Sequence, residues 1–172
     1  LEKLMENPSR RSTEELYRFL EHRQMPLTPD GNFLAYKGIR EDYTDWYSGK
    51  FSNKVGETLE MPRNGVCDDA SYGCSSGFHA GSLGYAEGYG NGGHLMVVEI
   101  SPKDVVSVPH DCDCQKLRTA KYKVVDHYKT KLADTYCDDY YEDESDDESG
   151  ESYDDGYDAG YDAAIAKIKK NL

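Results

Sequence analysis

The sequence lacks any long apolar run, and its most apolar stretches, residues 95–98 and 105–106, are only of strand length. A helix that crosses a bilayer needs about 20 consecutive apolar residues. The N-terminus also shows no signal-peptide pattern. We therefore expect no transmembrane segment. The chain opens at Leu1 without an initiator Met, which suggests that something precedes it.

The sequence has five cysteines, an odd number that does not suit a framework of paired disulfides. Because no export signal accompanies the cysteines, reduced thiols in a cytoplasm are the expectation. The five are Cys67, Cys74, Cys112, Cys114 and Cys137.

Basic residues are fewer than acidic ones, 20 against 33, and the formal net charge is −13. Nucleic-acid binding needs clustered Lys and Arg to neutralise phosphates. The composition therefore predicts no direct binding of nucleic acid by this segment.

The acidity belongs to the C-terminal part of the chain. Residues 134–172 hold fourteen Asp and Glu against three Lys, whereas the preceding residues are nearly neutral. Such a segment repels itself and cannot bury enough apolar surface to fold alone. We expect an acidic, disordered tail, with a low-complexity linker at 134–157 and a short amphipathic helix at 158–172 that forms on docking. The tail is suited to contact a basic surface.

The remaining residues, 1–133, are predicted to form one compact α+β domain. Ser12 and Glu15 form a capping box for a helix at 12–22, and Asn7-Pro8 ends a shorter helix before it. A second short helix, rich in Tyr, is predicted at 82–89 with Ser82 as its N-cap.

Strands are predicted from apolar and β-branched runs between turn residues. Residues 62–81 are rich in Gly, Ser, Asp and Cys and are expected to be mostly loop. Helices followed by many short strands favour an α+β domain with mostly antiparallel pairing over a parallel doubly wound sheet. The predicted strands are 33–39, 46–51, 55–61, 94–100, 105–108 and 117–125.

Two loops combine residue types that bind zinc. Cys67, Cys74 and His79 lie on one loop, and His110 lies with Cys112 and Cys114 on another. Neither loop has the C-x-x-C spacing of a zinc ribbon, so we expect free thiols and no metal. Cys74 and His79 also lack an orienting third group, so no catalytic residue is assigned. His79 is instead expected to be a buried, hydrogen-bonded histidine.

Six blocks of sequence resemble, in the same order, the rIIB family of T-even-type bacteriophages. They cover roughly residues 1 to 126, which makes chance similarity improbable. The blocks are Glu6-Asn7-Pro8-Ser9 with 27–37, Met61-Pro62-Arg63, 74–79, 102–109 and 116–125.

The resemblance implies a biological setting. Members of that family act in the infected cell, together with a rIIA partner, on lysis timing (lysis inhibition) and phage exclusion. It therefore implies a non-enzymatic accessory protein without a cofactor, which binds a rIIA-like or host protein. The expected location is the host-cell cytoplasm, at the inner membrane only through a partner. The family's N-terminal region, which resembles a helix-turn-helix, has no counterpart here.

Within the matching region, polar and reactive residues are candidates for one polar cleft, because convergent charged groups are the usual mark of a site. The alternative is that Lys37 and Arg118 pair with acids and Tyr122 packs in the core. The candidates are Lys37, Arg63, Asp69, Ser75, His79, Asp111, Lys116, Arg118 and Tyr122.

A second functional hypothesis is an ADP-ribosyltransferase-like enzyme, or an inactive relic of one, that uses NAD. The order of a strand at 36–38, a Gly-aromatic loop at 77–81, a Tyr-rich helix and a strand at 97–100 loosely follows that fold. Glu99 is the nominal catalytic carboxylate. The interaction hypothesis is preferred, and binding or consumption of NAD would decide between the two.

Overall fold

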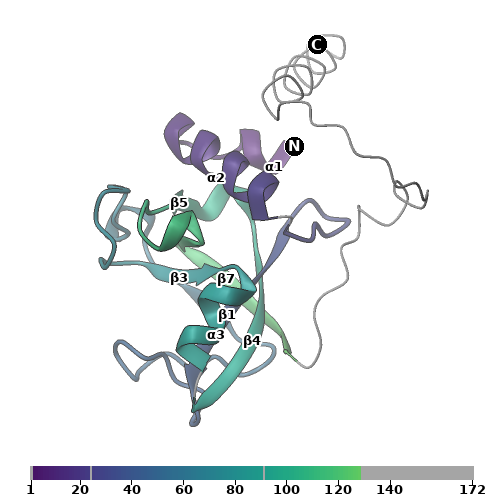
Figure 1. The fold of residues 1–172 in the computed structure, drawn as a ribbon. Helices are drawn as coiled ribbons and strands as arrows, with labels where there is room; N and C mark the ends of the chain where they lie inside the picture. Colours follow the sequence, from purple (N-terminus) through teal and green to yellow (C-terminus); the bar gives the residue numbers. More distant parts are fainter. Residues whose placement is uncertain (1, 24, 91, 129–172) are drawn as a thin grey trace, which may run out of the picture. The chain divides into compact units, whose positions relative to one another are not determined.

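The computed structural model describes residues 2–23, 25–90 and 92–128. Its helices cover one end and one face of a curved sheet (Figure 1). The helices are α1 (Glu2–Met5), α2 (Arg10–Arg23) and α3 (Leu83–Gly90), and the strands are β1 (Phe33–Arg40), β2 (Thr58–Glu60), β3 (Phe78–Gly81), β4 (Gly93–Ile100), β5 (Val105–Ser107), β6 (Lys116–Thr119) and β7 (Lys121–His127). Short 3-10 turns lie at Arg63–Gly65, Pro102–Asp104 and Cys112–Cys114.

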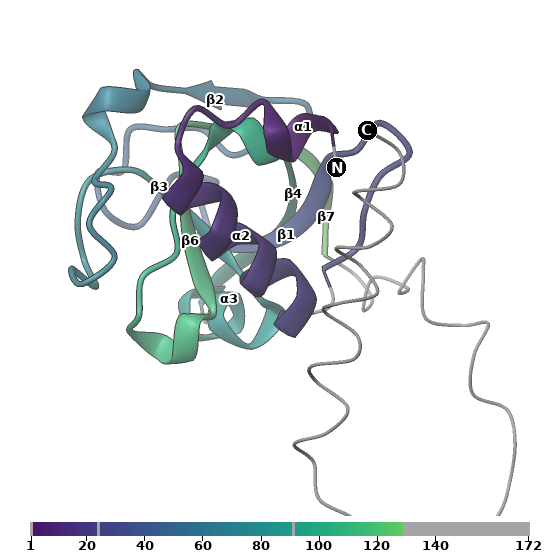
Figure 2. The same cartoon turned by 90° about the horizontal axis from the view of Figure 1, so that it is seen from above.

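The seven strands form one antiparallel sheet in the order β2-β7-β4-β1-β3-β6-β5. Only Ala120 separates β6 from β7, yet these strands stand near opposite ends of that order. The sheet must therefore curl, and Figure 2 shows the strands bending around in this way. Ala120 joins the two edges: its carbonyl accepts a hydrogen bond from Met61 N–H, and its own N–H donates to Asp104 O, each at 2.9 Å.

The concave face of the sheet holds the core. β1 and β4 pair over their whole length, so that Phe33 lies opposite Ile100 and Ala35 opposite Val98. All four of these side chains are completely buried. Because side chains alternate along a strand, this register places one apolar row of each strand inside the curled sheet.

Helix α3 packs closely on β1 at Gly38. A Cβ atom there would lie 2.5 Å from both Ala86 O and Gly90 N, so only glycine fits. Ser82 caps the helix, because its hydroxyl accepts a hydrogen bond from Tyr85 N–H at 3.3 Å. The predicted helix and its cap are confirmed.

The predicted capping box at Ser12 is wrong. Helix α2 begins at Arg10, and Ser9 Oγ accepts the hydrogen bond from Ser12 N–H at 3.2 Å. The Ser12 hydroxyl donates instead to Val106 O at 2.6 Å, and Glu15 accepts from Val108 N–H at 2.9 Å. The two side chains therefore attach α2 to the edge strand β5 and to Val108 just after it, rather than cap the helix.

Two strand predictions need correction. Residues 46–51 form a turn-rich loop rather than a strand. Residues 62–81 are mostly loop, as predicted, but end in the strand β3. The predicted single strand at 117–125 is divided into β6 and β7, because the chain passes from one end of the sheet order to the other at Ala120. The α+β class with mostly antiparallel strands is confirmed, and the expected acidic tail and its helix lie outside the described residues.

Among the described residues, no helix combines the length and the apolar character that crossing a membrane requires.

Candidate functional site

The segment between β1 and β2 exposes several apolar side chains at one place in the chain. We call residues 43–55 the aromatic loop. Tyr47 is fully exposed (101%), and Trp46 keeps 43% of its surface open to solvent. Phe51 and Val55 are exposed as well. Apolar side chains that gather on a surface, unlike single ones, are typical of interaction sites.

Asp45 fixes the backbone of the aromatic loop. Its carboxylate accepts hydrogen bonds from Ser48 N–H at 2.6 Å, from the Ser48 hydroxyl at 2.8 Å and from Phe51 N–H at 2.9 Å. Burial raises the pKa of Asp45, but these hydrogen bonds outweigh burial and bring the pKa to about 2. The side chain is therefore ionised at neutral pH, and it satisfies the turn as an acceptor.

Asn53 connects the aromatic loop to the core. It is completely buried, and its N–H donates to Tyr43 O at 2.8 Å while its side-chain amide donates to Phe51 O at 2.9 Å. The hydroxyl of Tyr122 on β7 donates to Asn53 Oδ1. Phe51 also meets Phe78 of β3 edge to face at 5.3 Å between ring centroids. The loop is thus held from inside the sheet while its tip stays exposed.

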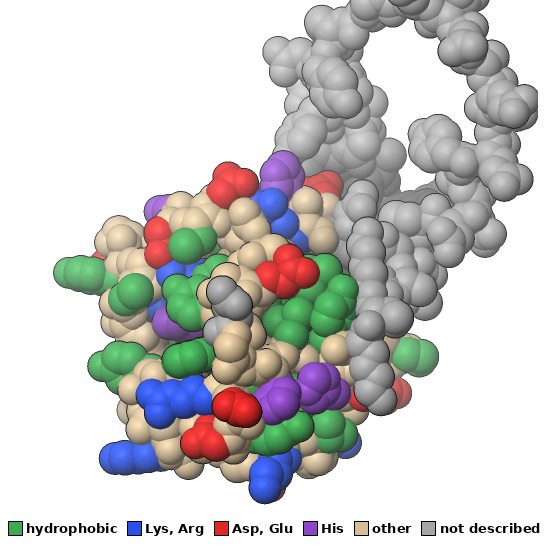
Figure 3. Space-filling view, turned by 60° about the horizontal axis from the view of Figure 1, so that its bottom comes forward, with side chains coloured by type: hydrophobic (Ala, Val, Ile, Leu, Met, Phe, Trp, Pro, Cys, Tyr) green, Lys and Arg blue, Asp and Glu red, His purple; other side chains and the backbone are tan. Residues whose placement is uncertain are grey.

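A shallow depression of about 470 Å³ lies beside Trp46. Arg40 forms part of its wall: the guanidinium donates to Trp46 O at 2.8 Å and stands over the indole ring at 5.7 Å. Glu41, Asp42 and Gly92 line the rest. An aromatic side chain next to a depression with both charge signs suits a partner that presents mixed polar and apolar groups. The surface in Figure 3 shows hydrophobic side chains interspersed with such charges.

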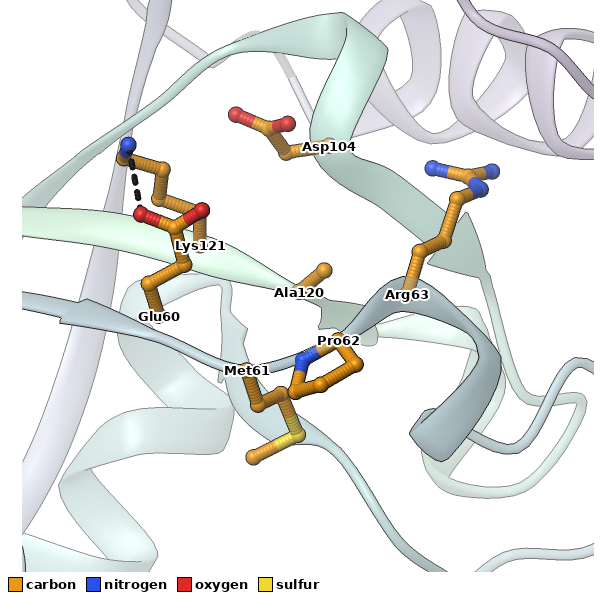
Figure 4. Close-up of a pocket in the computed structure, with 7 residues that line it drawn as sticks. All are labelled: Glu60, Met61, Pro62, Arg63, Asp104, Ala120 and Lys121. Atoms are coloured by element: carbon orange, nitrogen blue, oxygen red, sulfur yellow. Dashed lines mark hydrogen bonds and ion pairs between the residues drawn. The ribbon is translucent and has the colours of Figure 1, made fainter.

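A second depression, of about 350 Å³, lies where the sheet edges meet (Figure 4). Glu60 and Lys121 form an ion pair at 2.8 Å on one side, and Arg63 stands on the other. Asp104 lies between them. Burial raises the pKa of Asp104, and the charge of Lys103 opposes this shift. The Arg63 guanidinium donates a hydrogen bond to Val105 O at 2.9 Å, so this arginine has a largely structural role.

Lys37 and Tyr122 of the predicted cleft meet inside the curled sheet. The Lys37 ammonium donates to His79 O at 2.7 Å and lies 5.5 Å from the centroid of the Tyr122 ring. Burial lowers the pKa of Lys37 to about 8, and the charge of Asp45 opposes this shift. Neither depression described above includes Lys37.

Three of the predicted site residues form ion pairs or hydrogen bonds within the domain: Lys116, Asp111 and Arg118. Lys116 is only 2% exposed and pairs with Asp111 at 2.6 Å. Arg118 is completely buried and donates to Asp69 O and Ser107 Oγ, both at 3.1 Å. A buried guanidinium needs such acceptors, and here it satisfies the carbonyls of the loop before β3.

His79 stands beside Arg118 on the neighbouring strand. Its Nε2 atom is buried without a hydrogen-bond partner, so the expectation of a hydrogen-bonded histidine is wrong. Burial lowers the pKa of His79 to about 4, and the charges of Lys37 and Arg118 add to this effect. The ring is therefore neutral at physiological pH.

The last two predicted site residues lie in the loop before β3. Ser75 is exposed, and Asp69 uses its carboxylate to accept from the Ser71 hydroxyl at 2.7 Å. The sheet thus brings Lys37, His79 and Arg118 into neighbouring positions, whereas Arg63 faces the depression in Figure 4. Ligand binding by these residues stays a prediction.

The two Cys and His loops contain free thiols at each described cysteine, while Cys137 lies outside the described residues. Within 2–23, 25–90 and 92–128, no group of three or more His, Cys, Asp or Glu is arranged to hold a metal ion.

Sequence reasoning missed the aromatic loop because Trp, Tyr and Phe favour strands. The better signal was Asp45 followed by Ser48 and Gly49, since Asp and Ser side chains bind nearby amides and compete with strand pairing. Gly49 adopts a positive φ of 64°, as a tight turn requires.

Comparison with known proteins gives the lineage. The family model described as bacteriophage T4 protein rIIB matches residues 1–133. The chain belongs to the rIIB family. It is 40% identical to Protein rIIB of Enterobacteria phage T4 over 127 residues, which are 73% of this chain and 41% of that protein. This rIIB-family chain therefore spans about two fifths of the length of that relative. No solved structure matches it.

Proposed function

We propose that this rIIB-family domain acts by binding a partner protein, and that the aromatic loop is the contact surface. The observation that carries the proposal is the exposure of Tyr47 and Trp46 on a loop that Asp45 and Asn53 hold in one conformation. Tyr and Trp are enriched among the residues that dominate binding energy. A loop that is ordered before binding loses less entropy on association.

The proposed partner is the rIIA-type protein of the same phage, in keeping with the family. The proposed setting is the host-cell cytoplasm, where the pair contributes to lysis timing and exclusion and reaches the inner membrane only through the partner. A host protein as the partner is the other outcome of the same experiment. The proposed role needs no cofactor and no catalytic residue.

Alanine variants test this surface. We expect Trp46→Ala or Tyr47→Ala to weaken binding of the rIIA-type protein about 30-fold, equivalent to about 2 kcal/mol for a central aromatic contact. Titration calorimetry with the purified proteins gives the affinities.

Tyr72→Ala is the matched control, because Tyr72 is 61% exposed on a different loop. This variant is expected to bind as the wild type does. Equal weakening in all three variants, or none in any, would exclude the aromatic loop as the contact surface. The same variants in infecting phage are expected to alter lysis timing in the order of their affinities.

The NAD-dependent enzyme remains the alternative hypothesis. Glu99, its nominal carboxylate, accepts a hydrogen bond from Asn32 at 2.7 Å, and neither of the two depressions contains it. A thermal-shift and turnover assay with NAD separates the two functions. Stabilisation by NAD that Glu99→Gln abolishes would favour the enzyme.

A further inference from the structure

Two histidines from neighbouring strands face each other at the surface. His94 lies on β4 and His127 on β7, and His94 Nδ1 is 3.0 Å from His127 Nε2. Figure 3 shows a pair of histidine side chains side by side on this face. Both rings are half-buried, so one side of the pair remains open to solvent.

The outer nitrogens of the two rings contact backbone carbonyls. His94 Nε2 is 3.0 Å from Glu41 O, and His127 Nδ1 is 3.3 Å from Tyr128 O. A carbonyl oxygen only accepts, so an outer nitrogen that hydrogen-bonds to it carries the proton. When both outer nitrogens of two neutral rings donate in this way, both inner nitrogens present bare lone pairs to each other across 3.0 Å. This arrangement repels unless a cation is shared between the nitrogens.

The surroundings hold the pair in place. The Tyr43 ring stacks on His94 with centroids 4.1 Å apart and planes at 19°. Tyr43 adopts a φ of 66°, a left-handed conformation that is uncommon for a bulky residue. Its edge also approaches His127, at 6.4 Å between centroids. A strained residue that supports two imidazoles points to a function for their position.

We propose that His94 and His127 form a binding site for a divalent late transition-metal ion, of the Cu²⁺ or Ni²⁺ class. Imidazole nitrogens suit these ions, and metal-bound histidines usually donate their other N–H to a carbonyl or carboxylate. The two carbonyl contacts provide this support. The inference is independent of the proposed partner binding.

The distance between the two inner nitrogens indicates which coordination geometry the pair suits. Two ligands at about 2.0–2.1 Å from an ion, and 3.0 Å from each other, subtend an angle of about 95°. This is near the right angle between neighbouring ligands of a square-planar or tetragonal ion, and narrower than a tetrahedral angle. Binding one ion requires both rings to rotate so that the two lone pairs, which face each other across 3.0 Å, turn toward the common ion. Since no third His, Cys, Asp or Glu of the described residues completes a cluster, water fills the other positions.

Titration of the full 172-residue chain with Cu²⁺, after alkylation of its free thiols, tests the site. Excess Ca²⁺ is included, because this hard ion occupies carboxylates such as those of residues 134–172 without competing for imidazole. We expect one ion per chain, with nitrogen coupling in the electron paramagnetic resonance spectrum. His94→Ala and His127→Ala should each weaken binding by on the order of tenfold or more. His110→Ala, which alters an exposed histidine elsewhere, should not.

A measurement on the wild type removes any dependence on folding of the variants. Addition of Ni²⁺ should broaden or shift the imidazole NMR signals of His94 and His127 and leave those of His22 and His110 unchanged. Affinity that is unaffected by both alanine substitutions would overturn the proposal. So would signals that respond equally at all histidines, or a pair that binds no ion and shares only a proton.

Discussion

Substitution of Tyr122 by Phe isolates the one hydrogen bond that joins the aromatic loop to β7. The ring stays in place, so its contacts with Phe78 at 5.2 Å and with Lys37 at 5.5 Å persist. What is lost is the hydroxyl donor to Asn53 Oδ1, an acceptor on a completely buried residue. Burial raises the pKa of Tyr122 well above its usual value, so the wild-type hydroxyl is a donor at every pH of interest.

The expected loss follows from that geometry. An acceptor left buried without its donor costs about 1–3 kcal/mol, so we expect about 2 kcal/mol from Tyr122→Phe. For a domain of this size the melting temperature should fall by roughly 6–10 °C. Differential scanning calorimetry measures the fall, and hydrogen exchange should show faster opening at Ser48 and Phe51 N–H.

Tyr17→Phe is the matched control. Tyr17 is partly exposed on α2, and its hydroxyl forms no hydrogen bond within the described residues. Its removal should leave the melting temperature within about 1 °C, as is usual for a surface change. If Tyr122→Phe behaved in the same way, with unchanged exchange in the aromatic loop, the loop would not be held from the core.

Two further predictions concern the body of the domain. Gly38→Ala on β1 should destabilise the domain by about 1–3 kcal/mol, because the new Cβ would meet α3 at 2.5 Å. Gly88→Ala within α3, where the new Cβ has open space, should stabilise it by about 0.5–1 kcal/mol. Urea denaturation measures both changes. The pKa of Lys37 in the folded protein is about 8, below its ordinary value of 10.5. Between these two pH values the unfolded chain binds more protons than the folded one, so the free energy of unfolding should rise from about pH 8 toward pH 10. In Lys37→Met, that rise in the urea midpoint should be absent; an equal rise in the variant would assign it to other groups.

Local signals explain which elements the sequence predicts. Helix α3 follows from the Ser82 cap, a contact within a few residues. Strand β4 follows from an apolar run that favours a strand, although its hydrogen bonds join it to the distant strands β1 and β7. The division of residues 116–127 at Ala120 has no such signal. It follows from closure of the sheet, in which Ala120 bonds to both Met61 and Asp104.

The candidate sites also differ in how far local sequence signals can predict them. A list of charged residues does not reveal that the Arg118 guanidinium donates its hydrogen bonds to the carbonyls of a loop, because this depends on burial. Nor does it reveal the pairing of His94 with His127, which the register of β4 and β7 creates. The aromatic loop was within reach of sequence reasoning, but the strand preference of its aromatic residues concealed the turn set by Asp45.

Trp46 is the only tryptophan of the chain, so its fluorescence reports directly on the proposed contact surface. We expect its emission to shift to shorter wavelength as the rIIA-type protein is added, because the indole passes from solvent into an interface. The midpoint should equal the dissociation constant from calorimetry. Binding seen by calorimetry with an unchanged Trp46 spectrum would contradict the assignment of the aromatic loop as the surface through which this rIIB-family domain acts.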